Sequence, residues 1–199
     1  DMGGDNDRMI THQRATLGAT WGGSDWGIHL SSDLNYMLSN QAATGELTMN
    51  IYEAYASTDV MGYANVTAGR QALNYGSGAL MSSNDWGTNR TTWDGFKIGL
   101  DLDMADVTIG YASRNGGTVE EVDASNGSMW LNAGGEFSGW NVNLVYMTKT
   151  TAGESGENAA TGIDINGEVM GAGISASMNS DYNANDIRVI GLTYAINDD

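Results

Sequence analysis

Apolar and polar residues alternate strictly in several segments of this chain. In the segment FKIGLDLDM, every second residue from Phe96 to Met104 is apolar, and the residues between them are polar or glycine. Successive side chains of a β-strand point to opposite faces, whereas a helix repeats after about 3.6 residues. The alternation therefore predicts a strand with one apolar face and one polar face.

The same two-residue period recurs along the chain and predicts about eleven strands. Most runs are about 9–12 residues long, the length with which a tilted strand crosses a bilayer, whereas strands in soluble proteins average about 5–6 residues. A closed bacterial barrel has an even number of strands, so either residues 73–82 form a further strand or one strand is missing. The predicted strands lie at 14–21, 25–37, 46–57, 63–73, 92–104, 105–114, 127–138, 140–147, 161–169, 171–179 and 187–196.

The connections between these runs are of two kinds. Short turns are expected at 21–26, 103–106, 137–140 and 169–173, and long polar loops at 38–46, 114–128, 149–162 and 180–187. Short turns at one rim and long loops at the other are typical of up-and-down barrels. The sequence therefore predicts an all-β fold, an antiparallel up-and-down transmembrane β-barrel of about 10–12 strands with a polar lumen. Residues 1–199 are expected to form a single domain.

The two faces of the strands suit a membrane barrel, which is apolar outside and polar inside. A soluble sandwich or barrel would instead bury the apolar face, and alternation alone does not say which face is inside. If the apolar residues from Phe96 to Leu102 face outward, the membrane interpretation is favoured. Aromatic residues near strand ends would form girdles at the membrane interfaces, and these are Trp21, Trp26, Tyr36, Trp130, Trp140, Tyr146 and Tyr194.

Composition excludes several classes of function. With 25 acidic and 8 basic residues, and a formal net charge of −17, the chain has no basic patch for nucleic acid. Because cysteine is absent, neither a disulfide framework nor a thiolate metal site is expected. The sequence contains no run of about 18 apolar residues, so it predicts no transmembrane helix. We expect no metal centre and no cofactor.

The segment TAGRQALNYGSGALMSSNDWGTNRTTWDGFKIGL departs from the alternation and is a candidate for a catalytic or phosphate-binding loop. It lacks the Gly-Lys-Ser/Thr of a phosphate-binding loop, and no serine elbow accompanies His12 and His29, the two histidines of the chain. Asp85 and Asp94 are a possible carboxylate pair for glycoside hydrolysis, but such pairs are common in an acidic chain. We therefore expect no enzymatic activity and no catalytic residues.

Residues 46 to about 100 carry several short motifs in a particular order. These are Gly-Arg-Gln at 69–71, Tyr-Gly at 75–76, Asp-Trp at 85–86, Arg90 and Asp-Gly at 94–95. In their order and spacing they resemble the alginate-export-like porins of Gram-negative outer membranes. The resemblance implies a porin-like channel in the bacterial outer membrane, surrounded by lipid or lipopolysaccharide. It leaves open a homo-oligomer or an envelope complex. Members of that family are longer, so the chain is either a smaller barrel or part of a larger one.

The resemblance also implies that charged residues of this region face the lumen. Arg70 and Arg90 are expected to pair with acidic residues and to hold a loop that narrows the pore. The alternative is that these ion pairs only stabilise the barrel wall and have no part in selecting solutes. Because bases are scarce, a polyanion such as alginate would be repelled, and small neutral or cationic solutes are expected. The predicted pore-lining or constriction residues are Glu53, Arg70, Asp85, Arg90, Asp94, Lys97, Asp101 and Asp103.

Two other functions remain open at this point. A small barrel with paired internal charges could be closed to solutes and act as a structural or accessory component of an envelope complex. Alternatively, a soluble acidic β protein could bind Ca²⁺ through loops such as SNDWGTN and SDYNAND, although these lack the spaced carboxylates of an EF-hand loop.

Overall fold

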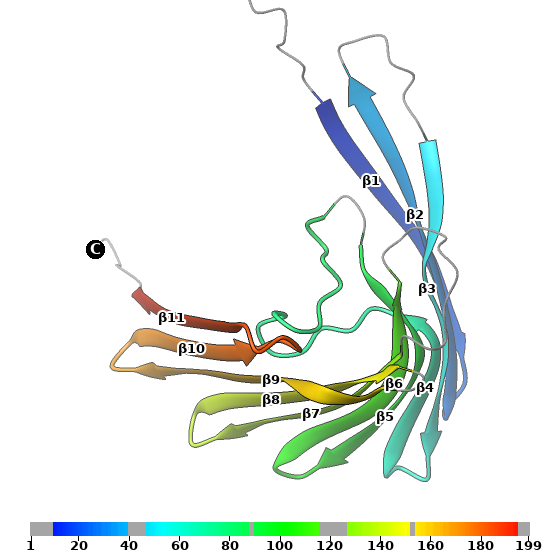
Figure 1. Cartoon of the computed structure of the whole chain (residues 1–199). Coiled ribbons are helices and arrows are strands. Elements are labelled where there is room, and N and C mark those ends of the chain that lie inside the picture. Colours follow the sequence, from blue (N-terminus) through cyan, green and yellow to red (C-terminus); the bar gives the residue numbers. More distant parts are fainter. Residues whose placement is uncertain (1–9, 40–46, 88–89, 116–126, 152–153, 195–199) are drawn as a thin grey trace, which may run out of the picture.

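The protein is all-β and forms one antiparallel sheet of eleven strands that follow one another in chain order (Figure 1). The structure is a computed structural model that describes residues 10–39, 47–87, 90–115, 127–151 and 154–194. The strands are β1 (Ile10–Gly22), β2 (Trp26–Ser39), β3 (Leu47–Val60), β4 (Ala64–Gln71), β5 (Thr92–Leu102), β6 (Ala105–Asn115), β7 (Gly127–Phe137), β8 (Trp140–Thr151), β9 (Glu154–Val169), β10 (Ala172–Ser180) and β11 (Asp186–Tyr194). Each strand pairs with its sequence neighbours, and the sheet is not closed, because β1 and β11 do not pair with each other.

The predicted up-and-down order and the count of eleven strands are confirmed, but two other expectations are wrong. Residues 73–82 form no strand. The long loop expected at 149–162 is largely strand, since β8 continues to Thr151, which pairs with Glu154 at the start of β9. Polar side chains misled the prediction there, because the ladder is built from backbone hydrogen bonds that do not depend on apolar residues. The central parts of the loops expected at 38–46 and 114–128 lie outside the described residues.

The tight turns at one rim have the backbone conformation of hairpins. Both central residues have positive φ in the β7–β8 turn (Ser138, 52°; Gly139, 81°) and in the β9–β10 turn (Met170, 53°; Gly171, 78°). Two consecutive residues of positive φ give a turn whose twist matches that of paired strands. These turns fix the register of the hairpins and hence the face to which each side chain points.

The sheet is curled, and the segment between β4 and β5 lies on its concave side (Figure 1). Large apolar side chains point away from this segment, and Phe96, Ile98 and Leu102 of β5 are 46%, 38% and 52% exposed. The convex face is therefore the apolar one, as expected for these residues. Of the expected girdle residues, Trp21, Trp26, Tyr36, Tyr146 and Tyr194 are exposed and Trp140 is partly exposed.

The buried core lies between the concave face and the segment from β4 to β5. Leu73 and Met81 of that segment belong to one buried cluster with Trp93, Trp130 and Met147. Trp130 is 2% exposed, so its assignment to a membrane girdle is wrong. Gly110 lies opposite Trp130 on β6, where a Cβ atom would overlap with the indole ring. The glycine thus makes room for a tryptophan on the inside of the curve.

Candidate functional site

The candidate site is built around residues 72–91, which we call the inner loop. It connects β4, which ends at Gln71, to β5, which begins at Thr92, and its described residues, 72–87 and 90–91, form no strand. Its own hydrogen bonds hold it together: the amide of Thr91 donates to the Ser83 carbonyl at 2.7 Å. The amide of Ser83 donates to Asn74 Oδ1, also at 2.7 Å. The described part of the loop is therefore an ordered element that can present side chains to both walls of the curved sheet.

At its C-terminal end the inner loop is held to β2 by an ion pair. Arg90 Nε donates to Asp33 Oδ2 at 2.8 Å, and Arg90 Nη2 donates to Asp33 Oδ1. Thr16 of β1 completes the group, since its hydroxyl donates to Asp33 Oδ1 at 2.7 Å and accepts from Arg90 Nη2 at 3.0 Å. Two parallel hydrogen bonds between a guanidinium and a carboxylate are among the stronger polar contacts in proteins.

Tyr52 of β3 lies beneath the guanidinium of Arg90. The Arg90 Cζ atom is 3.1 Å from the centroid of the tyrosine ring, a cation–π geometry. The register between β2 and β3 shifts next to Ser31 and Ser32, which leaves Tyr52 as an extra residue on β3. Such a bulge redirects a side chain, and here Tyr52 is buried beside Glu53.

The electrostatics of Arg90 follow from this enclosure. Burial alone would lower its pKa, but the hydrogen bond with Asp33 and the neighbouring negative groups outweigh burial, and the pKa of Arg90 is raised above its usual value. Asp85 of the loop adds a second carboxylate, 3.6 Å from Arg90 Nη1. Arg90 is therefore permanently charged and fully engaged by the wall.

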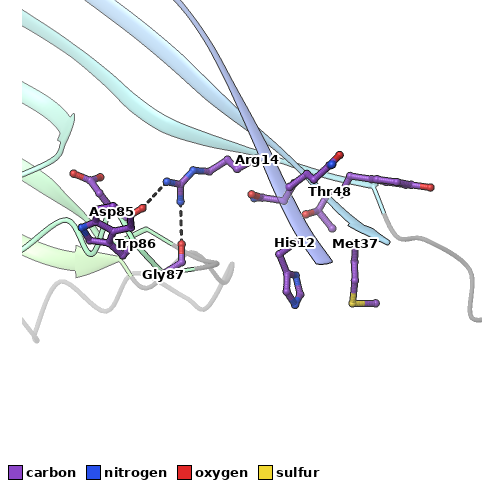
Figure 2. Close-up of a pocket in the computed structure, with 10 residues that line it drawn as sticks. His12, Arg14, Met37, Thr48, Asp85, Trp86 and Gly87 are labelled. Carbon is purple, nitrogen blue, oxygen red and sulfur yellow. Dashed lines mark hydrogen bonds between the residues drawn. The ribbon is translucent and has the colours of Figure 1, made fainter. Parts of the chain in front are cut away.

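A second arginine holds the adjacent part of the loop. Arg14 of β1 donates to the carbonyls of Asp85 and Gly87 at 2.5 and 2.9 Å (Figure 2). This contact borders a cavity of about 400 Å³ between the loop and the ends of β1, β2 and β3. The lining residues include His12, Arg14, Asn35, Thr48, Asp85 and Trp86. Because Arg14 binds backbone oxygens, it fixes the position of the chain whatever side chains the loop carries.

The N-terminal half of the inner loop contacts the opposite wall. The amide of Ser77 donates to Asp164 Oδ2 of β9 at 2.9 Å, and Ser77 Oγ accepts from Ser177 Oγ of β10 at 3.2 Å. Gly76 has a φ of +56°, and a Cβ atom there would overlap with Asp164 Oδ2. Glycine is therefore required both for the backbone conformation and for the close approach to β9.

Among the predicted site residues, Arg70 and Asp94 do pair, but not where they were expected. Arg70 Nε donates to Asp94 Oδ1 at 2.7 Å, and Nη2 donates to Oδ2 at 2.8 Å. On β5, Asp94 is adjacent to the buried Trp93 and two residues from the exposed Phe96. Its side chain therefore points to the same face as Phe96. The ion pair therefore lies on the convex face, and the assignment of these two residues to the pore lining is not supported.

The other predicted residues are distributed along the concave side. Glu53 accepts a hydrogen bond from the amide of Ala72 at 3.1 Å and lies 3.4 Å from His29 Nε2. Lys97 and Asp101 alternate with outward-facing residues of β5, so they share its concave face. Asp103 lies in the exposed β5–β6 turn. The structure thus joins Asp85 and Arg90 directly, and leaves Lys97, Asp101 and Asp103 outside that cluster.

Sequence reasoning missed most side-chain partners of the inner loop. Nothing in the sequence pairs Asp33 with an arginine that follows it by 57 residues. Only the glycine at position 76, next to an aromatic residue, hinted at a close backbone approach. The missed partners are Arg14, Thr16, Asp33, Tyr52, Asp164 and Ser177.

The loops considered for Ca²⁺ give no support to a metal site. Within the described ranges no three His, Cys, Asp or Glu side chains are grouped as metal ligands. In the β10–β11 loop, Asp181 accepts hydrogen bonds from the amides of Asn183 and Asn185 at 2.8 and 2.9 Å. The pKa of Asp181 is lowered mainly by a hydrogen bond from the Asn185 side chain, and further by the hydrogen bond from the Asn185 amide. Asp181 thus closes its own turn.

Comparisons with known proteins add no assignment. No family model matches the sequence, and no curated protein matches it. Across the residues that the structure describes, no helix is long and apolar enough to span a membrane.

Proposed function

We propose that the protein forms the wall of an outer-membrane, porin-like channel through which small neutral or cationic solutes pass. The observation that carries the proposal is the inverted distribution of polarity. Apolar side chains cover the convex face, while the inner loop and a polar wall occupy the concave side. A soluble β protein would be expected to bury its apolar face, whereas a membrane barrel turns it towards lipid.

The inner loop gives this channel its constriction. It contacts β2 through Arg90 and β9 through Ser77, so it bridges two distant parts of the wall. A loop anchored at both ends narrows the passage without blocking it completely, and it excludes solutes by size. This role is the one that the resemblance to alginate-export-like porins implies for the Arg-containing segment, and the proposed location is the outer membrane of a Gram-negative bacterium.

Charge decides which solutes are favoured. Arg14, Arg90 and Lys97 are the basic residues of the concave side discussed above, and the Arg90 charge is compensated by Asp33 and Asp85. Asp101, Asp106, Glu136 and Asp164 add negative charge along the same side. A passage lined in this way attracts cations and repels anions.

The proposal is tested by recording currents across planar lipid bilayers after the protein is folded in detergent and reconstituted. We expect discrete channels whose reversal potential in a salt gradient indicates a preference for cations. A protein that inserts but carries no current, or one that strongly prefers anions, would rule out the proposed transport.

A second function is favoured by the same anchored loop. If the contacts of Arg90 and Ser77 close the passage entirely, the barrel is a structural or accessory component of an envelope complex. Swelling of liposomes in solutes of increasing size separates the two functions. Release of the loop by replacing Arg90 should then create swelling where the unmodified protein shows none.

A further inference from the structure

The short turns that lie along one rim of the sheet share a sequence pattern (Figure 1). In four hairpins an exposed acidic residue is followed by an exposed apolar residue at the end of the strand, and the turn comes next. The four segments are DVMG at 59–62, DLDM at 101–104, EFSG at 136–139 and EVMG at 168–171. Because neighbouring residues of a strand point to opposite faces, the carboxylates line the concave edge of this rim and the apolar side chains line its convex edge.

Methionine occupies the tip of two of these turns in an unfavourable backbone conformation. Met61 and Met170 have φ angles of 56° and 53°, in a region that Asn, Asp and Gly adopt far more readily than other residues. Ser138 has the same conformation in the β7–β8 turn, at 52°, so the turn itself does not require methionine. The two methionines are 89% and 98% exposed and contribute little to the packing of the described chain. Apolar side chains held in strained, exposed positions indicate a contact with another molecule.

The charge of the rim restricts what can cover these methionines. Each of the four segments carries an exposed carboxylate on its concave edge, and Asp25, Asp103 and Asp106 add three more. None of the eight basic residues of the chain lies in or next to a short turn. Such a rim repels anionic lipid headgroups, and a purely apolar partner would desolvate the carboxylates without pairing them. A partner that brings both apolar and basic side chains is complementary to both edges.

Between the first two of these hairpins the rim is hollowed. A cavity of about 370 Å³ is lined by Asp59 and Tyr63 on one side and by Asp101 and Asp106 on the other. Asp101 and Asp106 are directly opposite each other in the register of β5 and β6, an arrangement of like charges that destabilises a sheet. Tyr63 is 80% exposed. A lysine or arginine side chain that enters this cavity would relieve the repulsion and meet an aromatic ring.

We propose that the short-turn rim docks a cationic amphipathic segment of a partner protein. The basic side chains of the segment lie along the concave edge, one of them in the cavity beside Tyr63. Its apolar side chains cover Met61, Met104 and Met170. Methionine suits such a contact, because its flexible, polarizable side chain adapts to the shape of a partner. The inference goes beyond the transport proposed above, since docking at the rim does not require that the channel conducts.

Docking is measured with a fluorescently labelled peptide of leucine and lysine at helical spacing, about four helical turns long. The full chain, folded in a neutral detergent, is titrated into the peptide, and empty micelles give the baseline. One analogue of the peptide replaces every lysine by glutamate, and another replaces every leucine by serine. We expect saturable binding of the leucine–lysine peptide, binding about tenfold weaker for the serine–lysine peptide, and none above the baseline for the leucine–glutamate peptide.

Variants of the protein test the two edges of the rim separately. Met61→Ser/Met170→Ser keeps the net charge, and serine already forms the same turn between β7 and β8, so the variant should fold and bind the leucine–lysine peptide about tenfold more weakly. Met129→Ser, on the convex face near the opposite rim, should leave the affinity unchanged. Asp106→Asn should weaken binding about two- to fivefold, whereas Asp186→Asn removes the same charge from the opposite rim and should not.

Several outcomes would overturn the inference. Equal binding of the leucine–lysine and serine–lysine peptides, or unchanged affinity in Met61→Ser/Met170→Ser, would show that charge alone attracts the peptide. Broadening of the Met61 and Met170 methyl NMR signals by a spin-labelled lipid in nanodiscs would show that the rim faces lipid instead. If the double variant does not fold, the peptide comparison on the unmodified protein still decides. Docking in a protein that carries no current would disprove the channel and leave this inference standing, whereas current without docking would do the reverse.

Discussion

Arg90 of the inner loop and Asp33 of β2 form a two-bond ion pair that ties the loop to the wall on the concave side of the sheet. Their side chains are 11% and 6% exposed, so the pair is largely removed from water. Removing one partner of such a pair leaves a buried charge without compensation, which costs about 3–5 kcal/mol. The contact is therefore both the principal anchor of the loop and a sensitive point of the fold.

Replacing Arg90 should release one end of the loop. Arg90→Met is expected to lower the free energy of unfolding by about 3–5 kcal/mol, because Asp33 stays buried, and to increase single-channel conductance. The double variant Arg90→Met/Asp33→Asn should lose less stability than Arg90→Met, since the uncompensated charge is gone. Equal losses in both variants, measured by thermal unfolding in detergent, would show that the ion pair does not anchor the loop.

Gly76 should tolerate no side chain, because its backbone lies against Asp164. Gly76→Ala is expected to destabilise the folded protein more than Gly171→Ala, in which the Cβ atom meets nothing within 4 Å. Both glycines have positive φ, so the control carries the conformational cost of about 1–2 kcal/mol without the steric contact. Denaturant titrations of the two variants measure the difference, and equal losses would contradict the close approach of the loop to β9.

The Arg70–Asp94 pair should have no influence on solute selection, because it lies on the convex face. Asp94→Asn is expected to leave the reversal potential in a salt gradient unchanged. Asp101→Asn removes the same charge from the concave face and should reduce the preference for cations. A shift in Asp94→Asn as large as that in Asp101→Asn would restore Asp94 to the pore lining.

The convex face can be tested directly with a charge in the middle of β5. Ile98 is already exposed, so Ile98→Arg should be nearly neutral if this face contacts water. If it contacts lipid near the midplane of the bilayer, the same change should destabilise the folded protein in the bilayer by about 2–4 kcal/mol. Lys97→Arg on the neighbouring concave position serves as the control and should fold normally. Folding yields in lipid vesicles distinguish these outcomes.

The strands could be predicted because their pattern is local. Alternation within β5 and β8 depends only on residues that are adjacent in sequence, and the structure has strands in both places. In β7 the pattern is ambiguous, since Met129, Trp130 and Leu131 are consecutive apolar residues. The neighbouring strand resolves that ambiguity, because Gly110 on β6 leaves space for an indole on the concave side. Trp130 is therefore buried in the core and is not part of an aromatic girdle.

Local sequence patterns were enough to predict the strand order, the apolar and polar faces of the strands, and one long irregular segment between β4 and β5. The resemblance implied only that Arg70 and Arg90 pair with acidic residues. That Arg70 takes Asp94, and on which face, depends on register, because a shift of one residue exchanges the two faces. Only the tertiary structure brought Arg90 to Asp33 and Ser77 to Asp164. The curvature of the whole sheet places these residues together, and a single bulge at Tyr52 shapes the contact, so neither pairing follows from any local pattern.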